Sequence, residues 1–531
     1  MRWIRPLSAQ VEETAETIGA KAHGLVALHR LGLPVPAGFV ITTGACRAFL
    51  REGRLPAGLD AELAAAMGDL ENAMGRRFGG TRAPLAVSVR SGAGVSMPGM
   101  MSTVLNLGLT IEATAALAAE TGDGRFALDS RLRYLSTFAS ALASTDLGGA
   151  PGLEEAQLTE AVEAAERHLR QRLGRAVPDS AAQQLELAVE TVFSSWDAPR
   201  ARTYRELHGI PHDLGTAVIV QAMVFGNRDG HSGTGVAFSR DPNTGEKAPF
   251  GDVLFGRQGE DVVSGRSLTR PLHELAERQP SVWTALVAAL DRIEAHYRDA
   301  CYVEFTFQAG ELWLLQARPG RFVGAAAVRL AADLADERLI TRDEALLRIS
   351  PQHLQHVRTP RMAAEKADVL GHGVGACPGV ASGRIATTTD AAVRMAADGP
   401  VILARPETSP YDMRGLAAAT GIVTSRGGPA SHAAVVARAM RKPAVVGLAD
   451  LVIDAAGASV RAGGRTLGEG AFVTIDGTSG EVALGSPPIV TDTADGHLRR
   501  LLAWADEVSG DRSQRDEEAR LKAAHAALRH T

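Results

Sequence analysis

The sequence predicts an α/β protein built from several domains. At roughly 100–200 residues per domain, 531 residues are enough for about three or four domains. Short β-rich runs bounded by Gly or Pro, such as PAGFVITT and PLAVSVRS, alternate with helical stretches rich in Ala, Leu and Glu. Apolar residues make up 45% and charged residues 22% of the chain, a balance that allows more than one buried core.

The first part of the chain contains three predicted segments. Residues 1–110 mix helical and β-rich patterns, which predicts an α/β subdomain. Residues 111–210 carry apolar residues at helical spacing, which predicts a helical insertion. Over residues 211–330, Gly-containing turns separate TAVIVQAMVFG, TGVAFSRDP, YVEFTFQAG and ELWLLQARP, so these runs predict a mainly antiparallel sheet.

Three further segments follow. Residues 331–369 predict a helical linker that ends near the Gly/Pro-rich run GHGVGACPGVASGRI. Residues 491–531 predict a charged helical tail. Between them, residues 370–490 predict a second α/β unit with strands near 384–388, 401–404, 421–424, 444–447, 471–475 and 481–484.

Charge, hydropathy and cysteine content exclude several classes of protein. The net charge is −5 without a long block of like charge, so we expect no general binding to nucleic acid or to an anionic membrane. No apolar run approaches the roughly 18 residues that span a bilayer, and the first residues lack the apolar core of a secretory signal, so we expect a cytoplasmic protein. Cys46, Cys301 and Cys377 are far apart and predict neither a disulfide nor a zinc site.

The segment TSRGGPASHAAVVARAMRKPAVVG, residues 424–447, carries the strongest chemical signal. It joins a strand, a Gly-Gly-Pro turn, a Ser that can cap a helix, and His432 in the first turn of that helix. Gly427 and Gly428 let the backbone approach a ligand, and the unpaired N–H groups at a helix start favour an anion. Because neutral imidazole is available near pH 7, His432 is suited to be the nucleophile of a phosphoryl transfer.

Four polar side chains extend this predicted phosphate site. Ser431 and Thr424 offer hydroxyl donors, and Arg405 and Arg438 offer positive charge.

The segment resembles the phosphohistidine motif of the pyruvate, phosphate dikinase family of PEP-utilising enzymes. The match extends to VILARPETSPYDMRGLAAATGIVTSRGG before it and to AFVTIDGTSGEVALG after it. The resemblance implies that His432 is phosphorylated and that it is carried on a swivelling β/β/α domain. The family usually has a Thr, which regulatory kinases modify in some members, where this chain has Ala430, so we expect that mode of switching to be absent.

Two segments of the first 110 residues predict binding of a polyphosphate. Lys21 lies in ETIGAKAHGLVALHRLGLPVPAGFVITT, and Arg90 lies in LAVSVRSGAGVSMPGMMSTVLNLG, which is dense in Gly, Ser and Thr. Backbone N–H groups and hydroxyls of such a loop bind phosphate oxygens, and Lys and Arg supply charge.

A third segment, YVEFTFQAGELWLLQARPG, predicts two strands around a short turn. Their alternation places Glu304, Gln316 and Arg318 on one polar face. Carboxylate and amide oxygens suit Mg2+, which takes one or two protein ligands together with substrate phosphates, and Arg318 would meet phosphate oxygens. A hairpin with a solvated outer face is the alternative interpretation.

Together these segments resemble the ATP-grasp nucleotide-binding domain of the same family, with VQAMVFGNRDGHSGTGVAFSRDPNTGE and QGEDVVSG between them. The predicted fold is therefore an α/β multidomain protein, an ATP-grasp domain with a helical insertion followed by the swivelling phosphohistidine domain. The resemblance implies nucleotide-binding roles for Lys21, Arg90, Gln221, Arg240, Glu260 and Arg318, and a Mg2+ site formed by Glu304 and Gln316.

One residue of the predicted metal site departs from the family pattern. The family commonly has an Asp two residues before the Glu, where this chain has Tyr302. We therefore expect an altered metal shell, and whether the neighbouring Asp299 reaches the site as a substitute carboxylate stays open.

The resemblance implies an ATP-dependent dikinase or phosphotransferase. ATP would give a pyrophosphoryl group on His432 with release of AMP, and phosphate would then remove the outer phosphoryl group as pyrophosphate. The family's C-terminal barrel, which binds pyruvate or phosphoenolpyruvate and typically needs about 250 residues, has no counterpart in the sequence. We therefore expect the acceptor to bind elsewhere, either pyruvate on a separate barrel subunit or another small molecule, and the resemblance leaves a homodimer open.

Two other functions remain open at this stage. One is an antibiotic phosphotransferase resembling rifampin phosphotransferase, although the helical stretches at 111–210 and 321–365 are short for its substrate domain. The other is a non-catalytic, nucleotide-binding remnant of a dikinase. Tyr302 favours such a remnant, whereas the presence of Lys21 and His432 argues against it.

Overall fold

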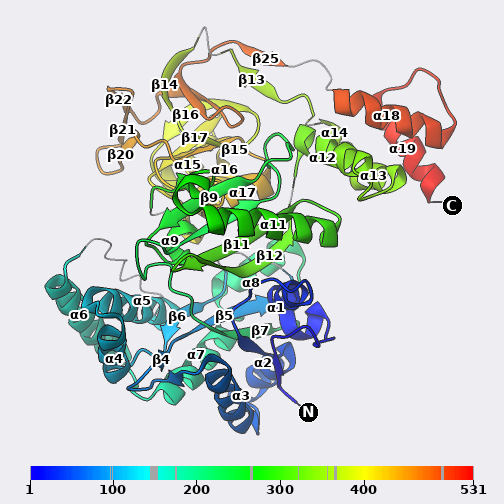
Figure 1. Ribbon diagram of the computed structural model, residues 1–531. Coiled ribbons are helices and arrows are strands. Elements are labelled where there is room, and N and C mark those ends of the chain that lie inside the picture. The colour runs from blue at the N-terminus through cyan, green and yellow to red at the C-terminus, as the bar shows by residue number, and fades with distance from the viewer. Residues whose placement is uncertain are drawn as a thin grey trace. The chain divides into compact units, whose positions relative to one another are not determined.

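The structure is a computed structural model of the chain, and it contains two compact units (Figure 1). The first unit consists of Met1–Arg228 and Trp313–Ala317, and the second consists of Asp229–Leu312 and Arg318–Thr531. The described residues are 2–95, 97, 100–143, 153–173, 176–263, 267–320, 322–355, 357–363, 367–491 and 496–529.

The first unit is built on an antiparallel sheet with the strand order β1-β2-β7-β5-β6. These strands are β1 (Ile4–Pro6), β2 (Gly38–Ile41), β5 (Val87–Ala93), β6 (Thr103–Leu107) and β7 (Thr216–Ala222). We expected the run TAVIVQAMVFG to share a sheet with the later strands, and this was wrong. All seven residues of β7 are buried, and the strand lies in the centre of the first sheet, paired with β2 on one side and β5 on the other.

Helices pack around this sheet, and several of them share an apolar core with it. The pattern at 111–210 correctly predicted helices there, because apolar side chains recur at helical spacing along Gly124–Ala143, Glu155–Leu173 and Ala181–Ser195 and pack into this core. The helices of the unit are α1 (Ala15–Arg30), α2 (Thr43–Glu52), α3 (Leu59–Met74), α4 (Ile111–Thr121), α5 (Gly124–Ala143), α6 (Glu155–Leu173), α7 (Ala181–Ser195) and α8 (Pro199–His208), and a short strand pair joins β3 (Arg77–Phe78) to β4 (Pro84–Leu85).

The second unit begins with another sheet, in the strand order β10-β9-β8-β11-β12. Ala309 and Gly310, both with positive φ, form the tight turn between β11 and β12. The register aligns Asp252, Val236 and Glu304 across three strands, and it aligns Phe250, Phe238 and Tyr302 in the next row on the same face. The elements are β8 (Gly233–Phe238), β9 (Phe250–Phe255), α9 (Gly259–Val263), β10 (Arg270–Pro271), α10 (Glu274–Arg278), α11 (Pro280–Tyr297), β11 (Cys301–Gln308) and β12 (Glu311–Pro319).

An eight-stranded sheet with the order β14-β24-β23-β16-β17-β18-β19-β15 forms the body of the predicted second α/β unit. Its strands are β14 (Asp368–His372), β15 (Val374–Cys377), β16 (Val380–Ala386), β17 (Val401–Arg405), β18 (Gly421–Thr424), β19 (Ala444–Val446), β23 (Phe472–Asp476) and β24 (Glu481–Leu484). All six strands predicted from the sequence are present, within a few residues. Strands β16 to β19 are parallel, and the other pairs are antiparallel.

This sheet has an apolar core on each face, which confirms the β/β/α expectation. One core involves the helices α15 (Thr389–Ala396), α16 (Met413–Ala418) and α17 (His432–Met440). The other involves the small sheet of β20 (Val452–Asp454), β21 (Ser459–Ala462) and β22 (Arg465–Gly468). A single 3-10 turn, Pro410–Asp412, precedes α16.

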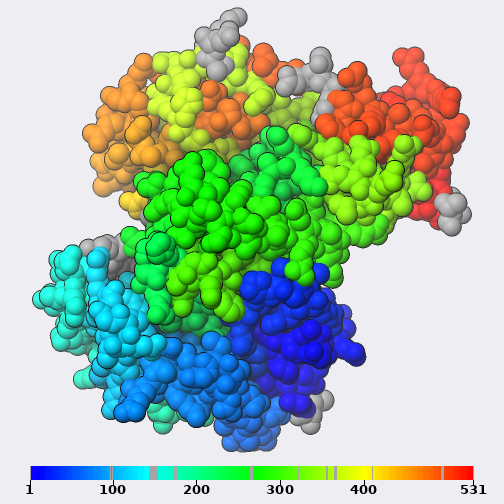
Figure 2. All heavy atoms as spheres, viewed as in Figure 1, coloured from blue at the N-terminus to red at the C-terminus, as the bar shows by residue number. Residues whose placement is uncertain are grey.

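Helices of the linker and of the tail form a third core of the second unit. Figure 2 shows the tail, in red, beside the linker helices in yellow-green. The strands β13 (Pro360–Met362) and β25 (Ile489–Thr491) pair where the chain enters and leaves the eight-stranded sheet. The helices are α12 (Gly324–Asp336), α13 (Arg342–Arg348), α14 (Pro351–Gln355), α18 (Gly496–Ser509) and α19 (Glu517–Leu528). The six segment boundaries drawn from the sequence stay predictions. In the part of the chain that the structure describes, every helix is too short or too polar to cross a bilayer.

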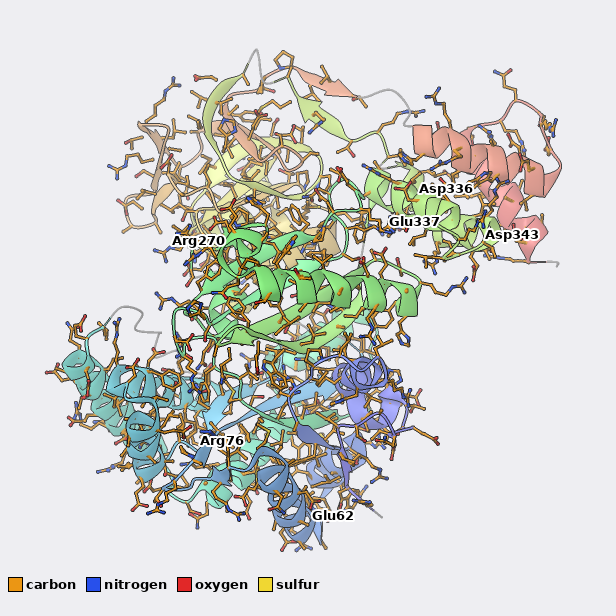
Figure 3. All side chains as sticks on the ribbon, viewed as in Figure 1. Glu62, Arg76, Arg270, Asp336, Glu337 and Asp343 are labelled. Atoms are coloured by element: carbon orange, nitrogen blue, oxygen red, sulfur yellow. The ribbon has the colours of Figure 1, made fainter. Side chains whose placement is uncertain are left out.

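A buried ionic network joins the sheet of β8 to α11 and α12. The side chain of Arg240 is 0% exposed and donates hydrogen bonds to Glu294 and Glu337, and Lys247 lies 2.8 Å from the same Glu337 carboxylate. Glu337 is labelled in Figure 3, at the end of α12. Because its guanidinium already serves two carboxylates, Arg240 has a structural role here. The nucleotide-binding role stays a prediction, since Nη1 of Arg240 is buried without a hydrogen-bond partner among the described residues.

We expect the substitution Arg240→Ala to lower the free energy of unfolding by about 3–5 kcal/mol, because it leaves the buried Glu294 carboxylate without its counter-charge. Urea-induced unfolding measures the loss. Arg465→Ala is the matched control, since it removes an ion pair whose two side chains are each 50% exposed, and it should cause no measurable loss. A variant at Arg240 with unchanged stability but weakened ATP binding would contradict the structural role.

Candidate functional site

His432 is the first residue of α17, where the chain turns after the parallel strand β18. The Ser431 hydroxyl caps the helix by accepting a hydrogen bond from the Ala434 N–H at 3.4 Å, as the sequence predicted. Gly427 has φ = +87°, a left-handed conformation that favours glycine, and it lets the chain turn sharply after β18. The candidate nucleophile thus lies at the positive end of a helix, an environment that stabilises a bound phosphoryl group.

The Thr408 hydroxyl lies 2.9 Å from Nδ1 of His432. Strands β17 and β18 are parallel neighbours with Arg405 opposite Thr424, so the loops at their carboxyl ends emerge side by side. Burial lowers the pKa of His432 to about 4, while the Asp412 carboxylate raises it by a smaller amount. The imidazole is therefore neutral near pH 7.

Asp412 organises the loop that carries Thr408. It is 6% exposed, and its carboxylate accepts hydrogen bonds from the Thr389 hydroxyl and from the N–H and hydroxyl of Ser409. Arg405 lies 3.3 Å from the same carboxylate, and its contact with phosphate stays a prediction. Our sequence reasoning missed Thr408 and Asp412, although Ser409 and Asp412 form a recognisable capping box within the run TSPYD.

Two of the predicted phosphate ligands instead stabilise the turn. Thr424 is 0% exposed, and its hydroxyl donates to the Arg426 carbonyl at 2.7 Å. Arg438 donates to the carbonyls of Ala376 and Pro429, and burial lowers its pKa to about 10. In this structure, both side chains hold the loop before His432 in shape, so their direct contact with phosphate stays a prediction.

The loop before His432 lies against the sheet of β8, β9 and β11. A Cβ atom placed on Gly428 would lie 2.1 Å from a carboxylate oxygen of Asp252, so only glycine fits there. Burial raises the pKa of Asp252 to about 6, and a hydrogen bond from the Thr269 hydroxyl opposes the rise. We expected Gly428 to let a ligand approach the backbone. In the structure, the Asp252 carboxylate approaches the backbone at this glycine.

The same sheet face carries Glu304, the predicted Mg2+ ligand, which is partly buried. The Tyr302 hydroxyl is a weak donor to Glu304 at 3.5 Å, and the guanidinium of Arg318 lies 4.4 Å from the centre of the Tyr302 ring. Burial raises the pKa of Tyr302, so this hydroxyl stays neutral and does not replace a carboxylate. Nε of Arg318 is buried without a hydrogen-bond partner among the described residues, which leaves a donor for a phosphate oxygen.

The contacts of Asp299 are with other residues, so its role as a substitute metal ligand stays a prediction. Asp299 lies 3.7 Å from Arg348 and accepts a hydrogen bond from the Ala300 N–H, and burial raises its pKa. Glu260 lies in the first turn of α9, which packs against β8. Within the described ranges, no three His, Cys, Asp or Glu residues gather as a metal site.

The other nucleotide candidates lie in the first unit. Arg90, on β5, donates to the side-chain oxygen of Gln221 and to the Leu315 carbonyl, and Gln221 is 1% exposed and donates to the Pro36 carbonyl at 2.8 Å. Gln221 therefore positions Arg90, and its direct contact with nucleotide stays a prediction. Gln316 follows Leu315 on β12 and belongs to this unit, so its pairing with Glu304 of the second unit stays a prediction.

Lys21 is brought to the same strand by a kink in α1. Gly19 interrupts the helix with φ = +80° and packs directly on the backbone of Gly92 in β5. A Cβ on Gly92 would lie 3.6 Å from Cβ of Lys21. The first unit thus brings Lys21, Arg90 and Gln221 together beside β5, and their contact with a polyphosphate stays a prediction.

Comparisons with known proteins agree with this architecture. The AMP/ATP-binding domain of pyruvate phosphate dikinase matches residues 15–73 and 54–270, and the mobile domain of PEP-utilising enzymes matches residues 397–480. The chain is 40% identical to pyruvate, phosphate dikinase of Rhizobium meliloti over 540 residues, which cover 95% of this chain and 60% of that protein.

Two further relatives show the same pattern. Pyruvate, phosphate dikinase 2 of Zea mays is 41% identical over 93% of this chain and 58% of its own length. Pyruvate, phosphate dikinase of Clostridium symbiosum is 38% identical over 95% of this chain and 60% of its own length. The chain thus spans about three fifths of the length of these relatives. It belongs to the pyruvate, phosphate dikinase family and carries that family's ATP-binding domain and mobile domain.

Proposed function

We propose that the chain carries out the nucleotide-dependent half of a dikinase reaction. ATP and phosphate are converted to AMP and pyrophosphate, and one phosphoryl group stays on His432 before it passes to an acceptor bound outside these residues. The observation that carries the proposal is the packing of the loop before His432. This loop lies on the face of the sheet that carries Glu304. The phosphate acceptor and a candidate metal ligand of the ATP-grasp fold are therefore associated in one compact unit.

The contact with Thr408 selects the reactive nitrogen. When Nδ1–H of His432 donates to the Thr408 oxygen, the lone pair of the ring lies on Nε2. Nε2 then attacks the β-phosphorus of ATP, so that an N–P bond forms and the bond from the β-phosphorus to the AMP oxygen breaks. Inorganic phosphate next attacks the outer phosphorus and leaves as pyrophosphate, and a single phosphoryl group remains on Nε2.

The phosphates are held by cations and by Mg2+ in this proposal. Lys21 and Arg90 of the first unit and Arg318 of the second supply the positive charge. Glu304 would hold Mg2+, for which Gln316 of the first unit is a separate candidate ligand, and the bound ion would neutralise phosphate charge during transfer. Glu304 fits this role as a partly buried carboxylate, whereas the neutral Tyr302 hydroxyl contributes no charge to the metal shell.

Pyruvate is the first acceptor to test, because the relatives are named for it. We propose that it binds to a PEP/pyruvate barrel outside the 531 residues and that the enzyme acts in the cytoplasm. A homodimer is the assembly to test first. The dikinase is preferred to an antibiotic phosphotransferase or a non-catalytic remnant, because the relatives are pyruvate, phosphate dikinases and a neutral histidine lies at the site.

Incubation with ATP labelled at the β-phosphate should place an acid-labile label on the protein, and His432→Ala should abolish it because no nucleophile remains. Label from the γ-phosphate should appear only when phosphate is absent, since phosphate removes that group as pyrophosphate. Retained β-label in His432→Ala, or no label on the unaltered protein with Mg2+ present, would sink the proposal. AMP release by chromatography is the second readout.

The substitution Thr408→Val should slow phosphohistidine formation by about tenfold to a hundredfold, because the ring loses the group that orients Nδ1. Thr408→Ser keeps the hydroxyl and should retain most of the rate. Single-turnover labelling with saturating ATP measures the change. Equal rates for the Val and Ser variants would show that the hydroxyl does not orient the ring.

The pKa of His432, lowered to about 4 by burial, should be directly visible by NMR. A histidine with an ordinary pKa near 6.5 loses about tenfold of its neutral form between pH 7.5 and pH 5.5, whereas His432 should stay neutral throughout this range. Titration of 13C-labelled histidines reports the pKa of each ring, and His432→Gln identifies the signal. A midpoint above pH 6 would contradict the buried setting of the ring.

A further inference from the structure

Two residues noted separately in the sequence meet in one apolar cluster of the second unit. Ala430, two residues before His432, is 4% exposed and packs with Tyr302, which is 3% exposed. The cluster is completed by Val236, Phe238, Leu254 and Val262, with Phe250 packed against it. Apart from Ala430, every member comes from the sheet of β8, β9 and β11 or from α9. The methyl group of Ala430, from the loop before α17, therefore packs on side chains of the sheet that carries Glu304.

The floor of this site is an aromatic pair. The rings of Phe238 and Tyr302 are 5.1 Å apart and meet edge to face at 65°, an arrangement that favours aromatic contacts. The guanidinium of Arg318 lies 4.4 Å from the Tyr302 ring, and that of Arg438, from α17, lies 5.6 Å from the Phe238 ring. Arg318 thus comes from β12 and Arg438 from α17, the helix of His432, and each guanidinium makes a cation–π contact.

Polar contacts beside the cluster join the same sheet to the loop before His432 and to β15. Asp252 meets the backbone at Gly428, and the Asn243 side chain donates to the Gly375 carbonyl at 2.9 Å. Separation of the two surfaces would expose the Phe238 and Tyr302 rings and leave Asp252 without the loop backbone. Both effects favour the associated state.

Resting on the function proposed above, we propose that Tyr302 and Ala430 are complementary positioning residues. Tyr302 and Phe238 form an apolar seat for the Ala430 methyl, and this seat holds His432 against the sheet that carries Glu304. The small side chain at 430 and the large one at 302 are therefore coupled, because added volume at one position must be relieved at the other. Tyr302, which by itself suggested a weakened metal site, acquires a role in seating the histidine carrier.

A double-mutant cycle tests this coupling in the full chain. Ala430→Thr adds volume inside the seat and should slow phosphohistidine formation by about tenfold while ATP affinity stays unchanged. It should also speed hydrogen exchange in residues 427–431 and 234–238, because the two surfaces separate. Tyr302→Ala combined with Ala430→Thr should recover both the slow exchange and most of the rate, since the smaller side chain at position 302 makes room for the atoms added at position 430.

Control variants separate seating from folding. Ala439→Thr adds the same volume on the exposed side of α17 and should change neither exchange nor rate. Tyr302→Phe keeps the ring and should keep slow exchange in both segments. The proposed seat would be contradicted if the effects of the two substitutions on exchange and rate were additive. It would also be contradicted if Ala430→Thr and Ala439→Thr caused equal changes. Hydrogen exchange can be measured without catalysis. If the exchange results agree with the seat but His432 is never labelled, the proposed reaction is rejected and the seat is not.

Discussion

The approach of the Asp252 carboxylate to the backbone at Gly428 is the contact around which the candidate site is organised. A side chain at position 428 would occupy the space of that carboxylate, so the Gly-Gly-Pro turn can rest on β9 only with glycine there. This turn sets the start of α17, and the start of α17 sets the place of His432. The packing of Ala430 in the cluster with Tyr302 then holds the same loop on the sheet face that carries Glu304.

Burial then sets the chemistry of the groups in contact. Removal of water keeps His432 neutral, raises the pKa of Asp252 and keeps the Tyr302 hydroxyl neutral. The cations of this half differ in their partners, because Arg240 pairs with two carboxylates, whereas the guanidinium of Arg318 lies over the Tyr302 ring. Arg240 therefore stabilises the fold, and a phosphate contact of Arg318 stays a prediction.

Much of the architecture could be predicted because local patterns decide it. The alternating strands of the second α/β unit, the cap at Ser431 and the helices of 111–210 follow from side-chain periodicity and from the hydrogen bonds that a helix start needs. The sheet that β7 joins could not be predicted, because TAVIVQA is apolar almost throughout and its partners lie far away in the chain. For the same reason, charge alone did not distinguish the buried Arg240 from a phosphate ligand.

The sequence by itself determined the family, the nucleophile His432 and the kinds of side chain that surround phosphate, because these depend on residue identity at short spacing. Only the tertiary structure decided which of them meet. Thr408 reaches His432 because two parallel strands end side by side, and Ala430 reaches Tyr302 because a loop packs on a distant sheet. Such contacts join residues separated by 24 to more than 100 positions, so their geometry depends on packing of the whole unit, which no local pattern records.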